Sequence, residues 1–187
     1  MSSFESEKST FYETENDLSI IHENLIPQIA KIINKRINKN EEKDEYINLV
    51  MEQSNLTFHS NELPNFSFED YIYRIKKYSQ IEDSILICAL IYIDKLIIKG
   101  LFISQYNIYR LFLTCVFVSC KLFDDRKNNI KFFSKIGGIN YIELNQLEYE
   151  FCSLINFDLF ISDKCFNHYH DFINNEIYKN KLIDLYE

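Results

Sequence analysis

The sequence predicts an all-α protein in which five helices pack around an apolar central helix. The chain has 187 residues, 47% of them hydrophobic, which suits the core of one compact domain better than two. It contains only three Gly and two Pro, too few for a turn-dense all-β fold. Apolar residues recur at spacings of three and four along most of the chain, which is the period of an amphipathic helix.

The N-terminal part is predicted to be a tail followed by one flanking helix. Residues 1–16 are acidic and rich in hydroxyl side chains, as in a disordered tail. The apolar spacing then predicts an amphipathic helix over residues 17–38, interrupted near its start by Pro27. A charged break follows at residues 38–45. Residues 46–64 are ambiguous, and one helical turn followed by a loop is the simplest interpretation.

Two of the five helices predicted to surround the central one lie between residues 67 and 100. Ser67 can cap the first, because its hydroxyl can accept from a free backbone N–H of the first turn, and that helix should end near Ser79. Asp83 or Ser84 can cap the second. It should end before Gly100, since glycine commonly follows the last helical residue.

The third predicted helix is the centre of the bundle. Ser104 can cap it, and it should run to about Phe123. Residues 111–118 are apolar on almost every face, so the helix must be surrounded by others.

Three further helices complete the prediction. A short one over residues 130–136 should stop at Gly137 and Gly138. Asn140 can cap the next, which should end at about residue 156. Ser162 can cap a last one, which should end at about residue 174.

Charge and composition exclude several classes of function. The net charge of −8 disfavours nucleic acid as a partner, since phosphate contacts need a local excess of Lys and Arg. No secretory signal is visible, and the longest apolar stretches are too short to span a membrane. Five Cys lie mostly in apolar stretches, as reduced thiols do. A soluble intracellular protein of the nucleus or cytoplasm, with no membrane contact, is expected.

Catalytic and metal-binding patterns are weak, so no catalytic residue, cofactor or metal site is expected. The string that contains Cys165, His168 and His170 has metal-ligand residue types but no second half to complete a four-ligand site. The ordinary interpretation is a helix with the thiol buried. No nucleotide-binding, nucleophile-elbow or zinc-protease string is present.

One family resemblance covers the chain from residue 58 to residue 173. The chain resembles a cyclin of the single-box Pho-type group, also called U-type or P-type, through strings that occur in the family's order. These strings are Phe-Glu-Asp-Tyr-Ile-Tyr-Arg-Ile-Lys-Lys-Tyr at 68–78, Leu-Ile-Tyr-Ile-Asp-Lys at 90–95, Tyr-Asn-Ile-Tyr-Arg-Leu at 106–111, Lys-Leu-Phe-Asp-Asp at 121–125, Phe-Phe-Ser-Lys-Ile-Gly-Gly-Ile at 132–139, Glu-Leu-Asn-Gln-Leu-Glu at 143–148 and Asn-Phe-Asp-Leu at 156–159.

The resemblance implies a division of the chain and a role. It implies a five-helix cyclin box at residues 58–175, an N-terminal helix and linker at 17–57, and a short C-terminal helical extension at 176–187. Cyclins are not enzymes. They bind a cyclin-dependent kinase and hold its C helix in the active arrangement, so a heterodimer with such a kinase in cell-cycle or nutrient signalling is expected. A cyclin-like adaptor without kinase activation and a cyclin-box transcription factor remain alternatives.

The resemblance also implies the kinase-binding residues. Lys121 and Glu148 match the two charges that bond the kinase's C helix, and apolar contacts are implied for Leu122, Phe157 and Leu159. From the pattern alone, the two charges could equally be surface groups or a mutual salt bridge worth under about 1 kcal/mol. One of the three apolar residues could belong to the core.

The family's buried acid–arginine pair is only half present in the matching strings. Asp94 resembles the acid, which in many cyclins pairs with an Arg of the first box helix. No Arg occupies the expected position, because Arg74 lies too far along that helix.

Overall fold

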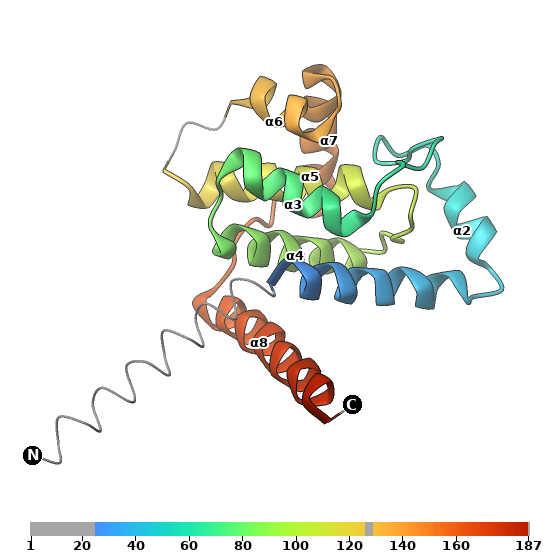
Figure 1. Cartoon of the computed structure of the whole chain (residues 1–187). Helices are drawn as coiled ribbons and strands as arrows, with labels where there is room; N and C mark the ends of the chain where they lie inside the picture. Colours follow the sequence, from blue (N-terminus) through green and yellow to red (C-terminus); the bar gives the residue numbers. More distant parts are fainter. Residues whose placement is uncertain (1–24, 126–128, 187) are drawn as a thin grey trace, which may run out of the picture.

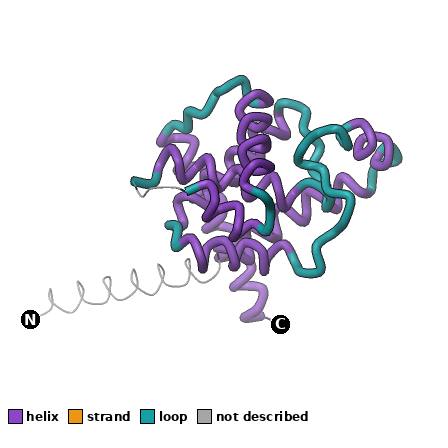
Figure 2. Tube along the Cα trace, turned by 90° about the horizontal axis from the view of Figure 1, so that it is seen from above, coloured by secondary structure: helices purple, strands orange, loops and turns teal. Residues whose placement is uncertain are grey.

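The computed structural model describes residues 25–125 and 129–186, with the side chains of the last helix described to Glu176. Every regular element in these residues is a helix, which confirms the predicted all-α class (Figures 1 and 2). The first, here called the N-terminal helix, is described from residue 25 to residue 41. The others are α2 (Tyr46–Glu52), α3 (Phe68–Ser79), α4 (Asp83–Ile98), α5 (Ile108–Phe123), α6 (Ile130–Gly137), α7 (Tyr141–Leu154) and α8 (Asp163–Tyr186).

The centre of the molecule is α5, as predicted. It contacts α3, α4, α6 and α7, which surround it in Figure 1. Every residue from 111 to 120 is buried, so removing this surface from water provides much of the hydrophobic stabilisation. Gly137 lets α6 approach closely, because a Cβ there would lie 2.1 Å from a methyl carbon of Leu113.

Three predicted helix caps are confirmed. The Ser67 hydroxyl accepts from the Asp70 N–H at 3.0 Å, and the Asn140 side chain accepts from the Ile142 N–H at 2.9 Å. Ser162 Oγ accepts from the N–H of Cys165 at 3.2 Å. Each satisfies a backbone donor that a helix start leaves free.

Two predicted caps are wrong. Ser104 does not begin α5, because the side chain of Asn107 folds the preceding turn by accepting from the Ser104 N–H and donating to the carbonyl of Phe102. The helix therefore starts at Ile108. In α4 neither Asp83 nor Ser84 is the cap residue. Glu82 holds that position without a side-chain cap bond.

Several predicted boundaries shift. The N-terminal helix continues to residue 41 rather than 38, and Pro27 lies within it without interrupting the described part. The ambiguous stretch after it contains α2, which is longer than the single predicted turn. At the other end α8 runs to Tyr186, so the last predicted helix and the C-terminal helical extension are one element. The predicted tail at residues 1–16 and the predicted helix start at 17–24 lie outside the described residues.

The N-terminal helix lies along α4 and is fixed to it by an apolar stripe and an ion pair (Figure 1). Ile29, Ile33 and Ile37, at helical spacing, are fully buried. Arg36 binds both oxygens of Asp94 on α4, with Nη2 at 2.9 Å from Oδ2. Asp94 is thus paired with an arginine of the N-terminal helix rather than with one of α3.

No helix in the described part of the chain combines the length and the apolar character needed to cross a bilayer. The last helix, α8, extends away from the bundle and carries the C-terminus in both views (Figures 1 and 2).

Candidate functional site

The structure brings Lys121 and Glu148 into direct contact. Lys121 lies in the last turn of α5 and Glu148 lies in the middle of α7, and Nζ is 2.5 Å from Oε1. The Lys121 ammonium also lies 5.4 Å from the ring centroid of Phe117, close enough for a cation–π interaction. The mutual salt bridge is therefore formed in the chain alone, which was one of the alternatives left open by the sequence.

The pair is half-exposed and retains bonding capacity. The Lys121 side chain is 46% exposed and that of Glu148 is 19% exposed. An ammonium has three donors and a carboxylate has two oxygens, so one bond between them leaves groups for a further partner. Neither residue makes another hydrogen bond or ion pair within the described residues.

Beside the pair, α5 ends with exposed apolar side chains. Leu122 is 45% exposed and Phe123 is 48% exposed, although the ten residues before Lys121 are all buried. The helix therefore emerges from the core at Lys121. Leu122 was predicted through the family resemblance, whereas Phe123 was not. The signal that could have indicated Phe123 was its position next to Leu122 in the same family string.

The end of α7 presents a second apolar group. Asn156 and Phe157 follow the helix with positive φ of +54° and +56°, a region that bulky residues rarely adopt. The N–H of Phe157 donates to the carbonyl of Cys152 at 2.8 Å, which closes the helix end. Phe157 is thereby held outward and is 66% exposed. Phe160, 76% exposed, was not predicted.

The loop after Phe157 is fixed to α4. The Tyr92 hydroxyl donates to the carbonyl of Leu159 at 2.7 Å, and the Lys95 ammonium donates to the carbonyls of Asp158 and Phe160 at 3.0 and 2.7 Å. Leu159 is only partly exposed and packs against the core. It differs from Leu122 and Phe157 in this respect, so the core interpretation applies to part of its side chain.

Cys152 connects the charged pair with the end of α7. Cys152 lies one turn beyond Glu148, and burial raises the pKa of its thiol, with Glu148 raising it further and Lys121 lowering it. The carbonyl of the same residue holds Phe157. We call the surface made by Lys121, Leu122, Glu148 and Phe157 the α5–α7 rim.

The string that contains Cys165, His168 and His170 lies in α8. His170 stacks on Phe166 and lies 3.5 Å from Asp171, and the described residues contain no group of three or more His, Cys, Asp or Glu that could hold a metal ion. The α5–α7 rim itself presents an ammonium group, a carboxylate and two exposed apolar side chains. Donors, an acceptor and rigid apolar side chains suit a protein surface.

Comparison with known proteins places these features in a family. The family model described as Cyclin matches residues 23–159. Cyclin-U4-3 of Arabidopsis thaliana is 36% identical over 132 residues, which cover 70% of this chain and 60% of the relative. Cyclin-U1-1 of the same plant is 30% identical over 128 residues, which cover 67% and 61%. Cyclin-P3-1 of Oryza sativa subsp. japonica is 30% identical over 142 residues, which cover 75% and 59%. The matched part spans about three-fifths of the length of these relatives.

Proposed function

The chain belongs to the cyclin family, and from that premise we propose that it is a regulatory subunit that binds and activates a cyclin-dependent protein kinase. The family is generally one of non-catalytic regulators. In this proposal the chain supplies no catalytic residue, and the kinase performs the phosphoryl transfer. That reaction requires a Lys–Glu ion pair that the kinase's C helix completes.

Activation by this route is a shift in a conformational equilibrium. A regulator can favour the active kinase only by binding that state more tightly than the inactive one. In the proposal the α5–α7 rim makes this distinction, because its charges and apolar groups would meet the C helix only in its active position.

The observation that carries the proposal is the arrangement of the rim. A paired lysine and glutamate are accompanied by two exposed apolar side chains, Leu122 next to Lys121 in the chain and Phe157 just after the end of α7. The ion pair holds both charged groups in place before a partner arrives, so less conformational entropy is lost on binding. Exposed apolar side chains around a partly desolvated charge pair are typical of binding hot spots.

The test is the double substitution Lys121→Ala and Glu148→Ala. Either substitution alone should weaken binding to candidate cyclin-dependent kinases, measured by calorimetry or pull-down, by about 2–5 kcal/mol, because it leaves the other charge unpaired at the interface. The double variant should also bind more weakly than the unaltered chain. The melting temperature should change little, since a half-exposed pair contributes under about 1 kcal/mol to stability.

The chain offers a matched control. Arg110 and Glu143 form a second ion pair between the same two helices, with Nε 2.6 Å from Oε1. The substitutions Arg110→Ala and Glu143→Ala should leave kinase binding unchanged. A folded Lys121→Ala/Glu148→Ala variant that still activates the kinase would refute the proposal. Binding of the unaltered chain without activation in a kinase assay would support an adaptor instead.

A further inference from the structure

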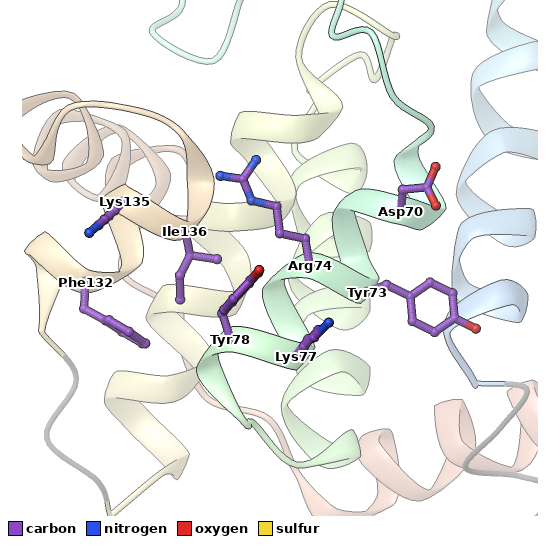
Figure 3. Close-up of a pocket in the computed structure, with 8 residues that line it drawn as sticks. All are labelled: Asp70, Tyr73, Arg74, Lys77, Tyr78, Phe132, Lys135 and Ile136. Carbon is purple, nitrogen blue, oxygen red and sulfur yellow. The ribbon is translucent and has the colours of Figure 1, made fainter.

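A groove of about 780 Å³ lies between α3 and α6, outside the α5–α7 rim (Figure 3). Three cationic side chains line it, namely Arg74, Lys77 and Lys135. Three aromatic side chains also line it, namely Tyr73, Tyr78 and Phe132, and each is at least two-fifths exposed. We call this site the α3–α6 groove.

The groove is basic within an acidic protein. Its one carboxylate, that of Asp70, accepts a hydrogen bond from the Ser67 hydroxyl at 2.6 Å at the start of α3. Arg74, Lys77 and Lys135 have no ion-pair partner among the described residues. The chain as a whole carries a net charge of −8, so this concentration of cations is local. Unpaired cations beside exposed aromatic rings favour an acidic ligand with aromatic groups.

The chain contains a segment of this chemistry. Residues 1–24, which the structure does not describe, hold six acidic residues and one lysine. Within them residues 11–15 read Phe-Tyr-Glu-Thr-Glu, two aromatic rings followed by two carboxylates one residue apart. This segment complements the groove in both charge and ring content.

The described chain also starts beside the groove. Pro27 of the N-terminal helix and Glu69 of α3 line one shared cavity, and Asp70 of the groove is the next residue. Figure 3 shows Tyr73, at the groove's edge, pointing toward the N-terminal helix. The ten or so residues between residue 25 and the acidic–aromatic segment can extend about 33 Å, so the segment can reach the groove.

We propose that residues 11–15 dock in the α3–α6 groove of the same chain. The carboxylates of Glu13 and Glu15 pair with the groove cations, and the rings of Phe11 and Tyr12 pack on its aromatic side chains. Because the segment is tethered, its effective concentration is of the order of millimolar, so modest intrinsic affinity is enough for occupancy. This contact does not depend on kinase binding.

The chain has no Trp, so Tyr12→Trp introduces a single indole as a reporter in the full chain. The indole should be several-fold less quenched by acrylamide in the chain than in a free peptide of residues 1–20 that carries the same substitution. Lys77→Glu with Lys135→Glu should raise quenching to the peptide's value. Adding Glu13→Lys and Glu15→Lys should restore the protection, since the charges are then exchanged.

The control is Lys99→Glu with Lys164→Glu, two exposed lysines outside the groove that give the same change in net charge. It should leave the indole protected. Protection should be independent of protein concentration and should decline in about 1 M salt, where the Debye length is near 3 Å. An indole as exposed as in the peptide, protection that survives the groove substitutions in a chain that melts normally, or protection lost on dilution would each overturn the proposal. The last outcome would indicate docking on a second copy.

Discussion

At the scale of single residues, one carboxylate joins three helices. Asp94 of α4 accepts two bonds from Arg36 of the N-terminal helix and one from the Tyr169 hydroxyl of α8, at 2.7 Å. Burial and the bond to Asp94 both raise the pKa of Tyr169, so its hydroxyl keeps the proton that it donates. The side chain of Asp94 is mostly buried, which makes these bonds stronger than exposed ones.

Replacing Asp94 tests this junction. Asp94→Asn keeps the shape of the side chain but removes its charge, and it should lower the free energy of unfolding by about 1–3 kcal/mol because bonds to a charged acceptor are the strong ones. The melting temperature should fall by about 2–4 °C per kcal/mol. Glu143→Gln, in an ion pair whose one partner among the described residues is Arg110, should cost less than about 1 kcal/mol. Equal losses in the two variants would argue against a three-helix junction.

At the scale of elements, the end of α7 holds an exposed aromatic ring in a conformation that lowers the stability of the folded state. Two consecutive residues with positive φ cost free energy when neither is glycine, and Phe157 bears the larger cost because of its bulk. The bonds from Tyr92 and Lys95 hold the loop that follows. A strained residue that is also exposed is consistent with a binding role for its side chain.

The substitution Phe157→Gly separates the two effects. It should raise the free energy of unfolding by about 1 kcal/mol, because glycine adopts positive φ without strain. Kinase binding should weaken, since the ring is lost. Phe157→Ala should weaken binding equally without the gain in stability. Urea unfolding measures the stability and a binding assay measures the kinase affinity. Normal kinase binding by the glycine variant would show that the Phe157 ring does not contribute to binding.

Local signals predicted the helices better than they predicted contacts between helices. Ser67 and the glycines after residue 136 mark helix ends through bonds within a few residues, so α3 and α6 were placed closely. The start of α5 was misplaced because the side chain of Asn107 competes for the same backbone groups. The end of α8 was missed because its polar sequence carries no stop signal.

The geometry of the candidate site was harder to predict than the helices, for a related reason. Periodicity assigns a residue to a face but gives no distance, so a mutual Lys121–Glu148 salt bridge and two separate surface charges remained alternatives until the structure gave the distance between them. The Arg36–Asp94 bond joins residues 58 positions apart. The family resemblance implied an arginine on the first helix of the box, which is α3, and not on the N-terminal helix. Leu122 and Phe157 were predicted as binding residues through the family resemblance alone, because an isolated apolar residue in a sequence is normally assigned to the core.

At the scale of the whole molecule, buried thiol and phenol groups that must stay protonated make the folded state less stable as the pH becomes alkaline. Burial raises the pKa of Tyr71 and Tyr92, and it raises the pKa of Cys88 to about 11 and that of Cys115 well above its usual value. The folded state therefore holds protons that the unfolded chain releases near pH 9 for a thiol and pH 10 for a phenol. Burial lowers the pKa of Lys76, so this one group has the opposite effect on the pH dependence of stability.

Stability should therefore be constant from about pH 7 to 8 and should fall above about pH 9. Each linked group contributes about 1.4 kcal/mol per pH unit between its unfolded and folded pKa. Thermal melts across this range measure the fall. Tyr71→Phe should reduce its slope above pH 10, whereas Tyr149→Phe, at an exposed position, should not. A melting temperature that stays constant to pH 11 would contradict the linkage.

The three-helix junction at Asp94 also orders events during synthesis. Arg36 precedes Asp94 in the chain, but Tyr169 is translated 75 residues after it. At about 5–20 residues per second, this interval lasts roughly 4–15 s. The nascent bundle can thus form its arginine bond while the tyrosine that completes the junction has not yet been made.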